Sequence, residues 1–221
     1  MTENKKSSST KNKRALNLST GLVERLREDI LSEKLYPGAK LTEKEICDEY
    51  SVSRTPVREA LKNLETEGLI ELIPNRGAFV IGFSLGDMKD LLELRKTYEL
   101  LAVKWAIERI YEDELEKLEK CYEYMKFYTK QKDYNKLYDI NNNFHNVIYD
   151  ATHNRTLTNV LSLYNYYIKH SVQTNPIEFE DLDIILDEHT KIFNAFIMQN
   201  VEEGIKAMRE HIDNASHRYL L

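Results

Sequence analysis

Residues 42–80 limit most strongly what this chain can fold into, because they carry start and stop signals for two short helices and a hairpin. Thr42 stands three residues before Glu45, which is the spacing of a capping box at the start of a helix. A second helix begins at Ser53 and places Pro56 in its first turn, where a missing backbone N–H costs nothing. These signals predict two consecutive helices joined by a tight turn.

The second of these helices is amphipathic and is followed by a hairpin. Its apolar residues recur at helical spacing and predict a buried stripe made of Val57, Ala60, Leu61 and Leu64. Gly68 is suited to the left-handed conformation that ends a helix. Two short strand-like runs, 69–73 and 78–81, flank the turn at 74–77. Together, the helices and the hairpin predict a winged helix-turn-helix over residues 18–82.

Two segments precede this motif. Residues 1–17 are rich in Lys, Ser, Thr and Asn and predict a disordered basic tail, which either contacts DNA phosphates or is simply solvated. From Ser19 onward, apolar residues at helical spacing predict an amphipathic support helix that is stopped by Pro37 and Gly38.

The remainder of the chain, 83–221, shows helical patterns throughout. The predicted helices span 85–110, 112–131, 133–152, 155–174, 178–199 and 201–219. Their short connections imply antiparallel neighbours, hence a bundle. The expected fold class is therefore mostly α: an N-terminal winged helix-turn-helix with a small β-hairpin, and a C-terminal antiparallel all-α bundle of about six helices.

Charge and composition exclude several classes of protein. The net charge is −6; residues 1–83 carry 14 basic and 13 acidic side chains, whereas 84–221 carry 17 and 24. Any contact with DNA must therefore come from a local basic surface. Cys47 and Cys121 match no metal or redox spacing, which favours two reduced buried thiols. Without a membrane-length apolar run or a signal-peptide pattern, we expect a cytoplasmic protein with no membrane contact.

The start of the second helix of the motif carries side chains suited to DNA. Arg54 and Arg58 lie one turn apart, and the planar guanidinium matches the O6 and N7 acceptors of guanine in the major groove. Ser53 and Thr55 are short donors suited to a phosphate or a base edge, and Lys44 on the first helix would reach the DNA backbone. The hairpin tip, formed by Asn75, Arg76 and Gly77, could enter the neighbouring minor groove. The alternative is that these side chains are merely solvated on an exposed helix.

Three of the six histidines fall on apolar helix faces in the second half. Asn141 and His145 are four residues apart and share one helix face. His189 and His211 lie within the last two predicted helices, among aromatic and aliphatic neighbours. Buried imidazoles need partners, and one shared metal ion would satisfy all three. The alternative is that each histidine bonds a carboxylate or the backbone.

The first part of the chain resembles a known family. The likeness covers about residues 19–82 and is clearest in SRTPVREAL, EGLI and NRGAFV. It resembles the DNA-binding domain of the GntR family of bacterial transcription regulators. The resemblance implies a homodimer on a two-fold symmetric operator. It also implies DNA contacts from Lys44, Ser53, Arg54, Thr55, Arg58 and Gly77, with Arg76 beside them.

Residues 84–221 resemble the helical effector-binding domain, FCD, of the FadR-type branch of that family, in its six-helix VanR-like subgroup. FHNVIYDATHNRTL and DEHTKIFNAFIMQNVEEGIKAMREHI carry this likeness. Such domains commonly bind a divalent metal through an Asp and three His. The histidines correspond to His145, His189 and His211, but the Asp position holds Asn141, a weaker neutral ligand. Three imidazoles and one oxygen favour zinc or nickel.

The resemblance also suggests the effector and one of its contacts. Arg95 matches an arginine that the family often uses near its effector; alternatively it forms an intrahelical ion pair with Glu99, four residues on. The family implies small carboxylate metabolites as effectors.

The expected function is a ligand-responsive DNA-binding regulator, a repressor, controlled by such a carboxylate in a metal-containing pocket. In one alternative the same regulator lacks the metal and the pocket binds the effector directly. In a remote alternative the bundle is a metal-dependent hydrolase with a DNA-binding appendage. No general base is evident in the sequence, so we expect no enzyme.

Overall fold

The computed structural model describes residues 21–171 and 181–220. The predicted tail, 1–17, lies outside these ranges. The chain divides into two compact units, one ending at Ser84 and the other beginning at Leu85.

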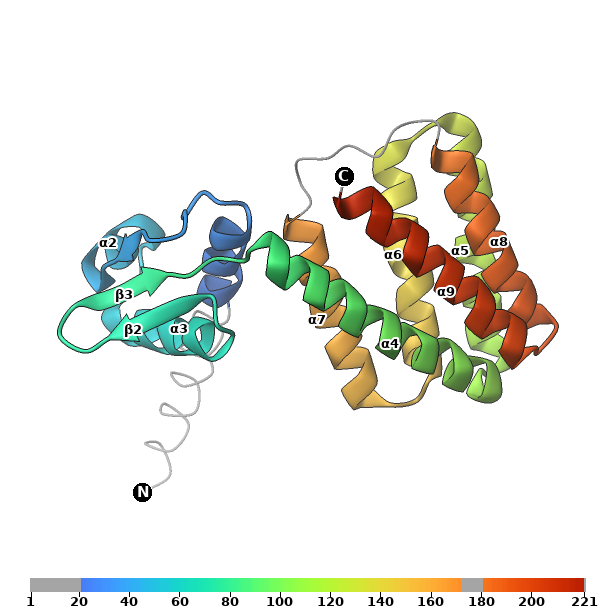
Figure 1. The fold of residues 1–221 in the computed structure, drawn as a ribbon, viewed down its shortest axis with the longest axis horizontal. Coiled ribbons are helices and arrows are strands. Elements are labelled where there is room, and N and C mark those ends of the chain that lie inside the picture. Colours follow the sequence, from blue (N-terminus) through green and yellow to red (C-terminus); the bar gives the residue numbers. More distant parts are fainter. Residues whose placement is uncertain (1–20, 172–180, 221) are drawn as a thin grey trace, which may run out of the picture. The chain divides into compact units, whose positions relative to one another are not determined.

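The first unit is a winged helix-turn-helix, as predicted (Figure 1). Its elements are a helix at 21–31, β1 (Lys40–Leu41), α2 (Glu43–Tyr50), α3 (Arg54–Thr66), β2 (Ile70–Ile73) and β3 (Gly77–Val80). Strand β1, which has only two residues and was not predicted, pairs antiparallel with β3 and gives the strand order β1-β3-β2. The support helix also stops earlier than predicted: it ends at residue 31, and Glu33 with φ 58° turns the chain before Pro37 is reached.

Local signals fix the position of α3. Thr42 caps α2, since its Oγ1 accepts the N–H of Glu45 at 3.2 Å. Pro56 lies in the first turn of α3, and Gly68 follows the helix with φ 75°. The predicted apolar stripe is buried: Val57, Ala60, Leu61 and Leu64 are at most 5% exposed. The opposite face of α3 is therefore left toward solvent.

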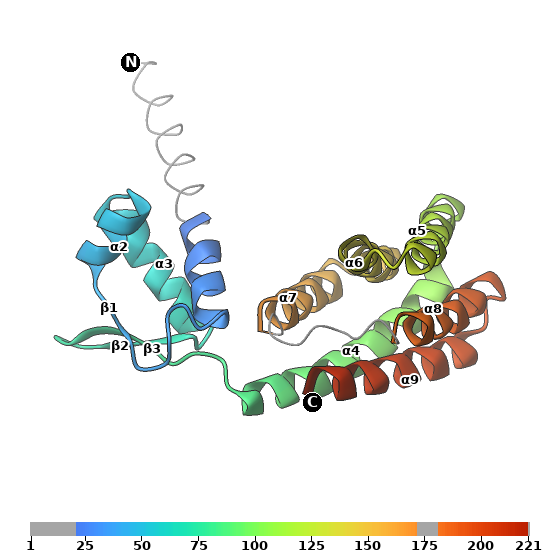
Figure 2. The ribbon, with the colours of Figure 1, turned by 90° about the horizontal axis from the view of Figure 1, so that it is seen from above.

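The second unit is a bundle of helices (Figures 1 and 2). They are α4 (Leu85–Arg109), α5 (Glu112–Gln131), α6 (Tyr134–Ala151), α7 (Arg155–Ser171), α8 (Asp181–Ile197) and α9 (Val201–Leu220). All six predicted helices are present, although 172–174 and 178–180 lie outside the described residues. Seen from above, α7, α6 and α5 form one layer and α4, α9 and α8 form the other, with α4 against α6 and α7 and α5 against α8.

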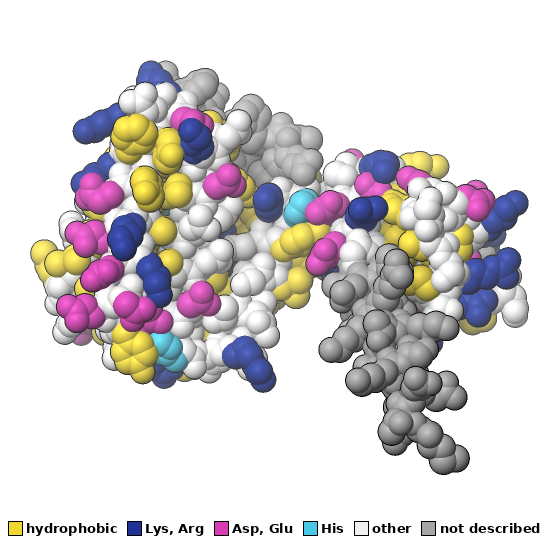
Figure 3. Space-filling model, turned by 180° about the vertical axis from the view of Figure 1, so that it is seen from behind, with side chains coloured by type: hydrophobic (Ala, Val, Ile, Leu, Met, Phe, Trp, Pro, Cys, Tyr) yellow, Lys and Arg dark blue, Asp and Glu magenta, His cyan; other side chains and the backbone are white. Residues whose placement is uncertain are grey.

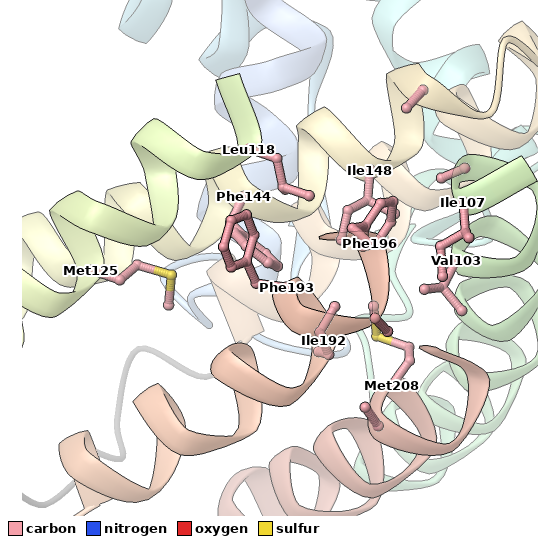
Figure 4. Packing of buried hydrophobic residues seen from close by; sticks show 14 of the residues in the cluster. Val103, Ile107, Leu118, Met125, Phe144, Ile148, Ile192, Phe193, Phe196 and Met208 are labelled. Carbon is pink, nitrogen blue, oxygen red and sulfur yellow. The ribbon is translucent and has the colours of Figure 1, made fainter. Parts of the chain in front are cut away.

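The two layers meet in a core of aromatic and aliphatic side chains (Figure 4). Phe144 and Ile148 from α6 lie close to Phe193 and Phe196 from α8 in this core, and all but Phe193 are almost completely buried. Helix α9 approaches α4 closely because Gly204 has no side chain: a Cβ there would lie 2.3 Å from Cδ1 of Ile107.

None of the helices in the described ranges combines the length and the hydropathy that spanning a membrane would require.

Candidate DNA interface and metal centre

The exposed start of α3 carries the side chains that were predicted to contact DNA. Ser53 is the N-cap residue, and Arg54, Thr55 and Arg58 follow on the first turns; all four are exposed. Lys44 on α2 and the wing-tip residues Arg76 and Gly77 are exposed as well. On the face in Figure 3, Lys and Arg side chains gather at the end of this unit that carries α2 and the wing.

Arg58 has a partner that the sequence analysis missed. Its Nε donates a hydrogen bond to Oε1 of Glu43, at 2.6 Å, between the first turn of α2 and the second turn of α3. This bond from Arg58 lowers the pKa of the Glu43 carboxyl. The pair holds the guanidinium of Arg58 across the two helices, near the protein surface.

The wing tip depends on backbone conformations that few residues adopt. Gly77 has φ 105°, in the region that favours glycine, and Asn75 has φ 62°. The N–H of Arg76 donates to the carbonyl of Ile73 at 3.0 Å, closing the turn. The tip is therefore tightly folded and exposes its backbone, as close approach to a nucleic acid requires.

In the bundle, three histidines from three helices meet. His145 on α6, His189 on α8 and His211 on α9 each offer a ring nitrogen, and these nitrogens all lie within 4.8 Å of one another. All three side chains are buried. The structure therefore brings together the three histidines that the sequence analysis grouped.

The hydrogen bonds of these histidines fix which ring nitrogens remain available. Nδ1 of His189 donates to the carbonyl of Ile185, at 2.7 Å, and Nδ1 of His211 lies 2.8 Å from a carboxylate oxygen of Glu188. Because a carbonyl can only accept, Nε2 of His189 carries a lone pair. Nε2 of His189 and both ring nitrogens of His145 are buried without a hydrogen-bond partner among the described residues. Buried lone pairs that converge in this way suit a metal ion.

Glu188 is a part of the centre that the sequence analysis did not assign. Its buried carboxylate accepts hydrogen bonds from Nδ1 of His211, from the amide of Asn214 at 2.8 Å and from the guanidinium of Arg218 at 2.9 Å. Burial raises the pKa of Glu188, but the bonds from His211 and Arg218 outweigh it and lower the pKa to about 2. Glu188 is therefore ionised and orients His211.

Glu99 is the second carboxylate beside the histidines, and it is 0% exposed. Its Oε1 accepts hydrogen bonds from the hydroxyl of Tyr149 and from Nε of Arg95, and it lies 3.7 Å from Nδ1 of His145. Burial raises the pKa of Glu99, but His145, Arg95 and Tyr149 together lower it to about 2. The intrahelical pair between Arg95 and Glu99, the alternative interpretation of Arg95, is thus formed.

The environment keeps two of the histidines neutral. Burial lowers the pKa of His211 to about 4 although Glu188 acts in the opposite direction. Burial, together with the neighbouring His211 and His145, lowers the pKa of His189 well below its ordinary value. Metal ions bind the neutral form of imidazole, so these two side chains are ready to coordinate one.

A pocket opens beside the histidines. Polar groups on its wall come from Arg95, Asn141, His211 and Arg218, and the remaining lining residues are Tyr134, Leu137, Tyr138, Leu182, Ile185 and Ala215. Asn141 is half-buried and lies one turn before His145 on α6. Arg95 faces this pocket while it pairs with Glu99, so its two suggested roles are compatible.

A winged helix-turn-helix unit joined to a helical unit with a pocket is the architecture of ligand-responsive transcription regulators. Residues 18–80 match the description "Bacterial regulatory proteins, gntR family", and residues 90–214 match the FCD domain. The chain belongs to the GntR family and carries an FCD domain.

Individual relatives agree with this assignment. The chain is 29% identical to the uncharacterized HTH-type transcriptional regulator YdhC of Bacillus subtilis, over 86% of this chain and 85% of that protein. It is 30% identical to the gluconate operon transcriptional repressor of Bacillus licheniformis, over 86% of this chain and 79% of that protein. The solved structure of Escherichia coli McbR/YncC has the same fold, with a TM-score of 0.69, 20% identity and coverage of 91% of this chain and 97% of that one.

The protein is therefore a DNA-binding transcription regulator of the GntR/FCD type, and its relatives include repressors. The families and relatives that it matches are regulators and not enzymes.

Proposed function

We propose that this protein is a repressor that binds a two-fold symmetric operator as a homodimer and responds to a small carboxylate in the bundle pocket. A divalent metal held by His145, His189 and His211 takes part in binding that carboxylate. The observation that carries the proposal is the convergence of three buried histidines, each offering a ring nitrogen within 4.8 Å of the others, beside a pocket that His211 lines.

The donor set fits zinc or nickel better than magnesium or calcium, because the three donors are imidazole nitrogens. Asn141 lines the same pocket and is the proposed fourth ligand, through its amide oxygen. When bound, the ion supplies an open Lewis-acidic position to which a carboxylate oxygen of the effector can bind. The positions of Glu188 and Ile185 behind the histidines direct the other ring nitrogens inward.

The pocket wall indicates what the rest of the effector is like. Arg95 and Arg218 supply positive charge, which suits an anionic ligand. Most of the remaining wall is apolar or aromatic, formed by Tyr134, Leu137, Tyr138, Leu182, Ile185 and Ala215. Among carboxylates, this lining suits an organic acid with a small apolar body.

At the other end of the chain, α3 enters the major groove with Arg54 and Arg58 directed at guanine. Ser53, Thr55 and Lys44 contact phosphates, and the wing tip at Arg76 and Gly77 enters the adjacent minor groove. Effector binding in the bundles then changes how the two copies of α3 are presented to the two half-sites.

Metal content tests the proposal. The purified full-length protein is stripped with a chelator, reloaded with zinc or nickel, desalted and analysed by mass spectrometry for metal per chain. We expect about one ion per chain in the wild type and almost none in His189→Ala. His217→Ala, which changes an exposed histidine outside the cluster, is the matched control and should keep its ion.

The same measurement separates the second candidate, a metal-free regulator whose pocket binds the effector directly. The presence of Asn141 where a carboxylate ligand is expected favours this candidate. A wild-type content below about a tenth of an equivalent after reloading would support it and contradict the metal site.

A further inference from the structure

We infer that Glu99 is a positioning residue of the metal centre. When the ion is bound, it accepts a hydrogen bond from Nδ1–H of His145 so that Nε2 faces the ion, and it supplies the negative charge that Asn141 cannot. This inference rests on the proposed metal site and concerns a residue on α4, outside the three helices that carry the histidines.

Each of the three histidines has an acceptor of the protein behind its Nδ1. Nδ1 of His189 faces the carbonyl of Ile185 and Nδ1 of His211 faces Glu188. For His145, the acceptor is Oε1 of Glu99, 3.7 Å from Nδ1. That gap is longer than a hydrogen bond, and both ring nitrogens of His145 lack a bond to any described residue. A carboxylate behind a metal-bound histidine fixes its tautomer and raises its basicity.

The carboxylate of Glu99 is itself incompletely satisfied. Oε1 accepts bonds from Tyr149 and Arg95, whereas Oε2 is buried without a hydrogen-bond partner among the described residues. A fully buried carboxylate with one unpaired oxygen is costly unless positive charge lies nearby. Arg95 supplies one positive charge at Oε1, and a cation among the three histidines would add positive charge on the side of the carboxylate that faces His145.

Charge around the centre leads to the same assignment. A divalent ion on neutral imidazoles leaves two positive charges, and Asn141 offsets neither. Arg95 and Arg218 also border the pocket. Glu188 and Glu99 are the carboxylates in contact with His211 and His145, respectively. Glu99 therefore takes over, from behind the histidine, the charge compensation that a ligand carboxylate at position 141 would give.

The test measures the zinc affinity of the full-length protein by competition with a chromophoric chelator, for Glu99→Gln beside the wild type. Glutamine keeps the size and loses the charge, and we expect affinity to fall roughly 10- to 100-fold. Glu114→Gln is the matched control: Glu114 also faces a histidine, His153 at 3.3 Å, but that histidine is not one of the three in the cluster. Glutamine at that position keeps the capping box, so zinc affinity should be unchanged.

A second variant separates charge compensation from a merely structural role. If Glu99 supplies charge, Asn141→Asp should restore most of the lost affinity in the Glu99→Gln background, since it adds a carboxylate at the position of the proposed fourth ligand. A structural defect in the network of Arg95 and Tyr149 would not be rescued in this way. In the zinc-loaded wild type, NMR should also show a protonated Nδ1 on His145.

The outcomes are distinct. If the wild type and Glu99→Gln bind zinc equally well, this inference is wrong and the proposed metal site is unaffected. A loss of affinity in Glu99→Gln that Asn141→Asp does not rescue would also overturn it. Wild type that binds no zinc would overturn both this inference and the proposed metal site.

Discussion

Oε1 of Glu43 accepts a hydrogen bond from Nε of Arg58 at 2.6 Å, so a carboxylate on α2 holds an arginine of α3 at the surface expected to meet DNA. Both side chains are partly or largely exposed, with 34% and 63% of their surfaces accessible, so water screens the pair and it is readily exchanged for another partner. On DNA, the guanidinium of Arg58 has guanine as that partner.

Two substitutions at this pair should affect operator affinity differently. Arg58→Ala removes the base contact and should lower operator affinity roughly tenfold or more. Glu43→Gln frees the guanidinium and removes a negative charge near phosphates, so affinity should stay the same or rise a few-fold. Gel-shift titrations at one salt concentration compare them on an operator that the protein has selected from random DNA. If Glu43→Gln loses binding as Arg58→Ala does, the pair is needed intact on DNA.

The metal-free protein should lose stability as pH falls from neutrality. Burial lowers the pKa of His211 to about 4 and lowers that of His189 as well, whereas an unfolded histidine titrates near 6.5. At pH values between these two pKa values, the histidines are protonated in the unfolded chain and unprotonated in the native state. The free energy of unfolding therefore decreases as pH decreases. Glu99 and Glu188, with pKa values of about 2 against 4.5, extend the loss in the same direction below about pH 4.5.

Urea titrations of chelator-treated protein at several pH values between about 7.5 and 5 measure this loss directly. The urea midpoint of the wild type should fall steadily over this range. His217→Gln, altered at an exposed histidine, should follow the wild type, whereas His189→Leu should depend less on pH. A wild-type midpoint that stays constant down to about pH 5 would show that the buried histidines already carry protons in the native state.

A side chain at Gly204 should strain the contact of α9 with α4. An alanine Cβ would lie 2.3 Å from Cδ1 of Ile107, and Val103 and Ala195 flank it at 3.5 Å. Overpacking of this kind costs about 1–3 kcal/mol, which exceeds the helix propensity of about 1 kcal/mol that alanine adds. Gly204→Ala should therefore lower the free energy of unfolding, and adding Ile107→Val should recover most of it. A single variant that is more stable than the wild type would show that Ile107 moves aside freely.

Most of the fold could be predicted from the sequence because its signals are local. The cap at Thr42, Pro56 in the first turn and Gly68 after the helix depend only on neighbouring residues, and they placed α2 and α3 correctly. The helical periodicity likewise gave α4 to α9. In contrast, β1 has two residues and exists only because β3 pairs with it.

The candidate site could be predicted only in part. The histidines stood out because imidazole is uncommon on an apolar helix face. Glu99 and Glu188 did not, since a glutamate on a helix usually faces water, and their burial results from the packing of α4 on α6 and of α8 on α9. The spacing of Arg95 and Glu99 was visible in the sequence, but a helix pair four residues apart gives no sign of being buried beside His145.

The central claim is that binding of an acid in the bundle pocket is coupled to operator binding by α3. An organic acid is first selected from a panel because it raises the melting temperature of the zinc-loaded protein. Fluorescence anisotropy then measures the affinity for the selected operator with and without saturating acid. We predict that the acid weakens operator binding roughly 5- to 150-fold and that operator DNA weakens binding of the acid by the same factor. An acid that binds one per chain and leaves operator affinity unchanged would contradict the account.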